Sequence, residues 1–183
     1  MNFIPTFESQ DTLWCACFPE DENVDIFSVL FEKWTDIEYL TTFFLDNLDD
    51  LKSPYWQGIS IDKAIDLVID EVHDLQEKLI CIDSGDSKSI SANTIFESLS
   101  ANEFSLKGIQ RKDFVKGKID SLPQMLRIYG VMLGDGTIVI SGGAIKLTHL
   151  MNRKHFDLEF ARLDRVNDYL KSFRITDKDG LKE

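Results

Sequence analysis

The chain has 183 residues, 43% of them hydrophobic and 28% charged, and its formal net charge is −12. This length fits a single domain over residues 1–183, and the 13 phenylalanines exclude a wholly disordered chain. The N-terminal segment has neither the basic nor the apolar stretch of a signal peptide, and no apolar run reaches membrane-spanning length. We therefore expect a globular protein of the cytoplasm.

The charges are divided unevenly along the chain. Residues 1–103 hold 22 of the 32 acidic residues but 5 of the 20 basic ones, whereas residues 104–183 hold 10 and 15, so the net charges are −17 and +5. We expect an acidic, mostly helical part with a first strand over 1–103, a sheet and a C-terminal helix over 104–175, and a frayed tail over 176–183. The two halves have different electrostatic roles or neutralise each other, or the acidic half serves only to keep the chain in solution.

The three cysteines do not form a metal-binding motif. Cys15 and Cys17 lie two residues apart in a predicted strand, and Cys81 is distant, so the spacing differs from that of a zinc site. We expect free thiols, no bound metal and no cofactor.

The N-terminal half is predicted to contain one strand followed by helices. Residues that favour β-structure predict a strand over 12–18, and apolar residues at helical spacing predict a helix over 24–34. Asp36 is suited to cap a second helix. The side chains predicted to face inward on this helix are Tyr39, Leu40, Phe43, Phe44 and Leu48. Ser60 is suited to cap the longest helix, predicted over 61–81.

The predicted 61–81 helix has an apolar face and an acidic face. Like charges four residues apart destabilise a helix slightly, so the acidic face either contacts a basic partner or is simply solvated. The candidate partner-binding residues are Asp62, Asp66, Asp70 and Asp74.

The middle of the chain carries weaker signals. Ser, Gly and Asp residues predict a loop over 83–93, and a short helix is predicted over 94–99. Residues 104–120 are rich in basic side chains, and their alternation of apolar and polar residues is weak. We expect a strand or an extended loop there. A C-terminal helix is predicted over 153–173 from its apolar stripe.

A β-hairpin is the clearest local signal in the C-terminal half. Residues 126–133 and 137–145 favour strands and flank Gly134-Asp135-Gly136, and an Asp-Gly pair between such runs predicts a tight turn. With a two-residue turn, Arg127 faces Ala144 and Tyr129 faces Gly142, with Lys146 on the same sheet face and a shallow depression between them. With a three-residue loop, Lys146 lies on the other face.

Three side chains of this hairpin suit a phosphodiester. Arginine binds phosphate through two hydrogen bonds, lysine stabilises developing negative charge, and tyrosine donates a hydrogen bond or stacks on a base. The alternative is an edge strand whose charges only limit aggregation. The candidate catalytic residues are Arg127, Tyr129, Lys146 and His149, and the candidate RNA phosphate-binding residues are Lys116, Lys118 and Arg153.

The same region resembles the HigB-like branch of the RelE/ParE toxin superfamily. The resemblance rests on Arg127-Ile128-Tyr129, the glycine turn, the apolar run 138–140 followed by Gly142-Gly143 and Lys146, and a helix with Glu, Ala, Arg and Tyr in order. It implies an α+β fold in which a small antiparallel sheet (one strand, helices, then three antiparallel strands) packs against helices, here with an extra helical insertion. It also implies ribosome-dependent cleavage of mRNA and a helix-turn-helix antitoxin as partner.

Two other functions fit the residues. In the first, the chain is a non-catalytic module that binds a basic DNA-binding regulator through its acidic helix. In the second, the chain binds a small molecule near Gly142 and Gly143, which predicts a deep, mostly apolar pocket at that place.

Overall fold

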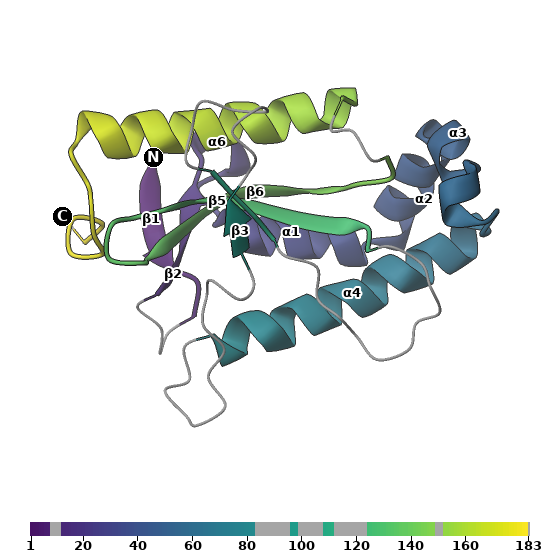
Figure 1. Ribbon diagram of the computed structural model, residues 1–183, viewed down its shortest axis with the longest axis horizontal. Helices are drawn as coiled ribbons and strands as arrows, with labels where there is room; N and C mark the ends of the chain where they lie inside the picture. Colours follow the sequence, from purple (N-terminus) through teal and green to yellow (C-terminus); the bar gives the residue numbers. More distant parts are fainter. Residues whose placement is uncertain (8–11, 83–95, 99–107, 112–123, 149–151, 183) are drawn as a thin grey trace.

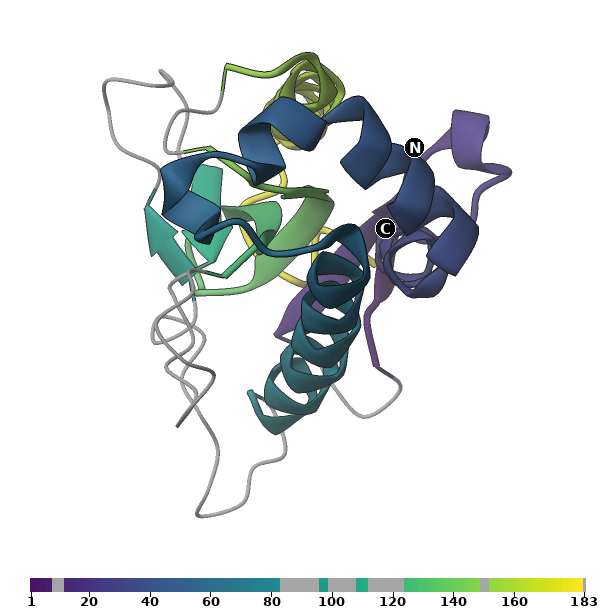
Figure 2. The ribbon, with the colours of Figure 1, turned by 90° about the vertical axis from the view of Figure 1, so that its right-hand side faces the viewer.

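The computed structural model describes residues 1–7, 12–82, 96–98, 108–111, 124–148 and 152–182. Over these residues the fold is α+β, as expected: helices lie on both faces of one sheet (Figures 1 and 2). The helix α6 runs along one face, and α1 and α4 lie on the opposite side. None of the helices in this part of the chain combines the length and the apolar character needed to cross a membrane.

The sheet is mixed, so the expected purely antiparallel sheet is wrong. Its β2–β6 pair is parallel, and its other pairs are antiparallel. A parallel neighbour requires a long crossover, which the helices between β2 and the C-terminal strands supply. In spatial order the strands are β1 (Asn2–Pro5), β2 (Leu13–Cys17), β6 (Ile138–Ile145), β5 (Leu126–Met132), β4 (Gly108–Arg111) and β3 (Phe96–Ser98).

Local capping determines where the helices begin, as the sequence predicts. Asp36 accepts hydrogen bonds from the backbone N–H groups of Glu38 and Tyr39, and Ser60 accepts one from Lys63. The predicted 61–81 helix is confirmed with the same bounds. The helices are α1 (Ile26–Thr35), α2 (Ile37–Asp46), α3 (Leu48–Leu51), α4 (Ile61–Cys81) and α6 (Lys154–Ser172), with short 3₁₀ turns at Pro19–Asp21 and Pro54–Trp56.

The helix α4 buries its apolar stripe and exposes most of its acidic face. Asp62, Asp66 and Asp70 are exposed, and Asp74 is half-buried. On its inner side, the Glu71 carboxylate accepts hydrogen bonds from the backbone N–H groups of residues 125 and 126, at 2.8–3.0 Å. The helix therefore holds the first residue of β5 in place.

The β5–β6 hairpin turns through three residues. The Leu133 N–H donates to the Thr137 carbonyl at 2.7 Å, and the Asp135 carboxylate accepts from the Thr137 N–H at 3.0 Å. Gly136 has a φ of +89°, a left-handed conformation that favours glycine. The two-residue alternative is thus wrong.

A β-bulge cancels the effect of this turn on the strand register. One extra residue of β6 lies opposite the junction of Tyr129 and Gly130. Beyond the bulge, Arg127 pairs with Ala144 and Tyr129 pairs with Gly142. The pairing expected for a two-residue turn is therefore reached with a three-residue turn, because two changes of parity compensate.

Four expectations about other segments are wrong or fall wholly or partly outside the described residues. The short helix over 94–99 is wrong where it can be seen, because residues 96–98 form β3 and pair with β4. The tail is not frayed over 176–182: the Gly134 N–H donates to the Thr176 carbonyl at 2.8 Å, and Leu181 is buried. The predicted loop over 83–93 and most of the basic segment 104–120 lie outside the described residues.

Candidate functional site

The predicted hairpin site is occupied by the protein itself. Tyr129 is fully buried, and its ring packs against Phe160 of α6 with centroids 5.6 Å apart. Arg127 is half-buried, and its Nη1 donates to the carbonyls of Gln124 and Leu126, at 3.1 and 2.7 Å. Neither side chain is presented to an RNA strand in this arrangement.

The expected shallow depression at Gly142 is filled. A Cβ at this position would lie 2.1 Å from the Glu159 Oε2, so the carboxylate of α6 occupies the space that a side chain would take. The same Oε2 accepts a hydrogen bond from the Gly143 N–H at 2.9 Å. The small cross-strand neighbours thus allow α6 to approach the sheet closely.

The remaining predicted residues are dispersed. Lys146 follows β6 and is partly buried. Arg153, at the start of α6, forms a bidentate ion pair with Asp50 at 2.6 and 2.7 Å, which lowers the pKa of the Asp50 carboxyl. The predictions for Lys116, Lys118 and His149 lie outside the described residues.

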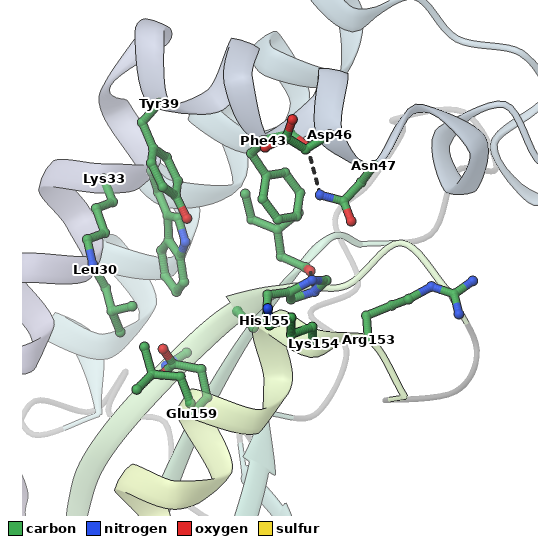
Figure 3. A pocket seen from close by; sticks show the side chains of 15 residues that line it. Leu30, Lys33, Tyr39, Phe43, Asp46, Asn47, Arg153, Lys154, His155 and Glu159 are labelled. Atoms are coloured by element: carbon green, nitrogen blue, oxygen red, sulfur yellow. Dashed lines mark hydrogen bonds between the residues drawn. The ribbon is translucent and has the colours of Figure 1, made fainter.

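A pocket of about 670 Å³ lies beside the last residues of β6, and we call it the β6-end pocket. This volume suits a small organic ligand. Its walls come from α1, α2, the end of β6 and the first turns of α6 (Figure 3). The side chains that matter for binding are Lys33, Trp34, Tyr39, Phe43, Lys154, His155, Leu158 and Glu159.

Aromatic rings form much of the pocket wall. Tyr39 and Phe43 are stacked with their centroids 6.4 Å apart, and Phe43 meets the imidazole of His155 edge to face at 5.3 Å. Tyr39 is exposed, and Figure 3 shows its ring directed into the cavity between Lys33 and Phe43. This surface can accept a planar ligand by stacking.

Cations lie at the rim of the pocket. Lys33 and Lys154 are exposed, and neither forms an ion pair within the described part of the chain. Arg153 is directed away from the cavity (Figure 3), and its guanidinium pairs with Asp50. Two lysine ammonium groups are therefore available to an anionic ligand, against a single exposed carboxylate, Asp46, in the lining.

Burial alters the proton affinity of a carboxyl group and an imidazole in the pocket. Burial raises the pKa of the Glu159 carboxyl, although the Gly143 N–H and the Arg162 guanidinium act in the opposite direction. Burial lowers the pKa of the His155 imidazole. His155 Nε2 lies 3.0 Å from the Ile145 carbonyl, which can only accept, so Nε2 carries the proton and Nδ1 is the acceptor of the neutral ring.

Sequence reasoning missed the lining of this pocket. Tyr39 and Phe43 were expected to face inward on their helix, and their helical spacing indicates a buried stripe rather than a cavity wall. The sequence prediction that comes near this pocket is that of a mostly apolar pocket near Gly142 and Gly143. Gly143, Ala144 and Ile145 line the β6-end pocket.

No group of His, Cys, Asp and Glu within the described residues is arranged to hold a metal ion. Comparison with protein-family models, with curated proteins and with solved structures gives no match to this chain.

Proposed function

We propose that this protein is a toxin-like protein of the RelE/HigB kind that acts on mRNA and holds one nucleotide in the β6-end pocket. The observation that carries the proposal is a partly exposed aromatic wall beside two lysines that form no ion pair within the described residues. Single-stranded RNA is bound in general by stacking of bases on aromatic rings and by cations that contact the phosphates.

The residues suggest a division of roles. A base stacks on Tyr39 and Phe43, and the phosphate lies near Lys33 and Lys154. We therefore assign the site to the β6-end pocket beside Gly143 rather than to Arg127 and Tyr129. Arg127 donates to backbone carbonyls, and Tyr129 is buried. The mRNA substrate is proposed from the sequence resemblance; along the chain, two strands are followed by helices and then by strands of which β4, β5 and β6 form an antiparallel run.

His155 is the residue we assign to proton transfer. A neutral imidazole can accept the proton of a ribose 2′-hydroxyl, whose oxygen then attacks the adjacent phosphorus. The bond from phosphorus to the 5′-oxygen of the next nucleotide breaks, and this oxygen takes a proton from water and leaves as a hydroxyl. The upstream product ends in a 2′,3′-cyclic phosphate. The lowered pKa of His155 keeps the ring neutral and able to act as a base near neutral pH.

The decisive test reverses charge at the pocket and at a matched distant site. We expect Lys33→Glu with Lys154→Glu to weaken binding of a labelled single-stranded RNA about tenfold or more, because both phosphate-contacting cations are replaced by anions. The binding is measured by fluorescence anisotropy at fixed salt, and growth inhibition is scored on inducible expression. Lys63→Glu with Lys52→Glu, at exposed positions outside the pocket, is the control because the net charge changes equally.

The results separate the rival sites. Equal loss in both double variants means that binding depends on net charge alone, and the pocket assignment fails. Loss of growth inhibition in Arg127→Ala, with an unchanged response in the pocket variant, returns the site to the hairpin. If the unaltered protein neither slows growth nor cleaves translated mRNA, the toxin proposal fails.

A second candidate function is a binding module for a basic partner, such as a helix-turn-helix regulator. It is favoured by the exposed Asp62, Asp66 and Asp70, which have no ion pair within the described residues. We expect Asp66→Lys with Asp70→Lys to abolish co-purification of such a partner. Glu32→Lys with Asp49→Lys is the matched control, and equal effects of the two reversals would exclude a specific acidic surface.

A further inference from the structure

A second pocket, of about 750 Å³, lies at the turn end of the β5–β6 hairpin, and we call it the turn-end pocket. Its walls are the last residues of β5, the hairpin turn, the final turn of α6 and the segment that follows α6. The side chains that contribute apolar surface are Val131, Met132, Leu133, Leu170 and Ile175.

A buried polar side chain lines this apolar space. Asn167 of α6 is 6% exposed, and its Nδ2 has no hydrogen-bond partner among the residues that the structure describes. An unsatisfied buried N–H group is costly, and native proteins rarely retain one without a role. An acceptor that enters the pocket and reaches Nδ2 would satisfy this amide.

Two cations lie at the edge of the same space. Lys171 and Arg174 line the pocket and are exposed, and neither forms an ion pair within the described residues. A carboxylate seated between them would accept from the guanidinium and lie close to the ammonium.

The backbone at Arg174 is unusual for this residue type. The Ile175 N–H donates to the Leu170 carbonyl at 2.9 Å and the Arg174 N–H donates to the Lys171 carbonyl at 3.1 Å, which is the hydrogen-bond pattern of a helix end that normally carries glycine. Arg174 nevertheless adopts a φ of +56°. Glycine would adopt this left-handed conformation with less strain, whereas arginine places a guanidinium at the pocket.

The segment after α6 is attached firmly enough to form a wall. The Gly134 N–H donates to the Thr176 carbonyl, and the Asp135 carboxylate accepts from the Lys178 N–H at 3.0 Å. These bonds join the hairpin turn to residues 176–178 and close one side of the pocket.

We propose that the turn-end pocket binds a small carboxylate with a hydrocarbon body, whose tail lies on the aliphatic walls and whose carboxylate meets Asn167, Lys171 and Arg174. This inference does not depend on the proposed action on RNA. The pocket suits an aliphatic rather than an aromatic body, since its apolar walls come from Val, Met, Leu and Ile side chains.

Calorimetric titration of the intact chain with decanoate tests the proposal. We expect saturable binding with one site, and binding at least about tenfold weaker for decanol, which has the same tail without the charge. Arg174→Gly is expected to weaken decanoate binding about tenfold or more without loss of folding, because glycine suits the left-handed backbone there. Asn167→Leu is expected to weaken it as well, and Lys63→Ala is the control.

Three results would overturn the proposal. The first is equal affinity for decanoate and decanol. The second is an unchanged affinity for decanoate in Arg174→Gly. The third is a chain that binds a peptide with a C-terminal leucine but does not bind decanoate. Decanoate binding lost in Lys33→Glu with Lys154→Glu, and kept in Arg174→Gly, would assign the ligand to the β6-end pocket. RNA binding is measured separately, so failure of one proposal does not decide the other.

Discussion

The two pockets lie at opposite ends of the same helix and the same hairpin. The 19 residues of α6 span about 28 Å, with the β6-end pocket at the first turns and the turn-end pocket at the last. The first has aromatic walls from elements distant in sequence, whereas the second has aliphatic walls from the hairpin and the helix end. One scaffold therefore presents two kinds of surface.

Two buried polar residues of α6 explain part of the difference. Glu159 extends over Gly142, accepts a hydrogen bond from the backbone and fills the space there. Asn167 is buried to a similar degree, but its amide nitrogen has no acceptor within the described part of the chain. A satisfied polar group closes a gap between helix and sheet, and an unsatisfied one leaves a binding group beside a cavity.

The largest effect is expected from Gly142→Val. A Cβ there would lie 2.1 Å from Glu159 Oε2, so the carboxylate must move and lose its bond to the Gly143 N–H. We expect a loss of about 3 kcal/mol in unfolding free energy, because overpacking combines with an unsatisfied buried group. Chemical denaturation measures it.

The Gly142→Val variant also sharpens the comparison of the pockets. If it remains folded, RNA binding should weaken while decanoate binding persists, because the turn-end pocket is remote from Gly142. Equal loss at both pockets would mean that they form one cooperative unit. Gly58→Val is unsuitable as a control because Gly58 has a positive φ, so Thr42→Val, at an exposed position that lines neither pocket, serves instead.

A pH-dependent effect of intermediate size is expected from Glu159→Gln. Burial raises the pKa of Glu159 in the folded chain, so the folded state binds its proton more tightly than the unfolded state. The contribution of Glu159 to stability is thus greatest below its unfolded pKa and declines as pH rises through its folded pKa. As the pH rises through this range, the Glu159→Gln variant should gain stability relative to the unaltered chain.

Paired denaturation curves of the unaltered and Glu159→Gln chains at several pH values provide the measurement. The difference between the two curves isolates Glu159 from other groups, such as Asp50, whose pKa is lowered through Arg153. A difference that does not change with pH would mean that Glu159 titrates alike in both states. The turn-end pocket should bind decanoate equally in both chains.

The smallest effect is expected from Arg174→Gly, and its sign is stabilising. Removing a non-glycine residue from φ +56° relieves about 1 kcal/mol of backbone strain, partly offset by the greater freedom of glycine in the unfolded chain. We expect a gain of roughly 0.5 kcal/mol in unfolding free energy. A destabilised variant would mean that the Arg174 side chain contributes to the fold and not only to ligand binding.

The predicted parts of the fold are those with short-range causes. The α4 bounds follow from Ser60 and a regular apolar stripe. The pairing of Arg127 with Ala144 matches the prediction for a two-residue turn, but it arises from a three-residue turn combined with a β-bulge. The helix predicted over 94–99 is wrong because residues 96–98 form a strand that pairs with β4. The residues next to 96–98 in the sequence do not indicate that pairing.

The candidate site depended more on long-range contacts. Arg127 and Tyr129 form a plausible phosphate site in the sequence, but Phe160 and Glu159 of α6 cover the strand face that carries Tyr129. Tyr39 and Phe43 indicate a core stripe until the start of α6 is placed beside them. Phe43 and His155 are more than a hundred positions apart, and the contacts of α6 with the hairpin also join separate elements, so no local pattern specifies them.

The sequence by itself determined the helices, their caps and the strands of the hairpin, because hydrophobic periodicity, capping and turn chemistry act over a few residues. Only the tertiary structure decided which side chains face a ligand. It placed Tyr129 in the core, filled the space at Gly142 with Glu159, and left two pockets at the ends of α6. The physical reason is that packing of distant elements, and not the residue type alone, determines which polar groups are already satisfied.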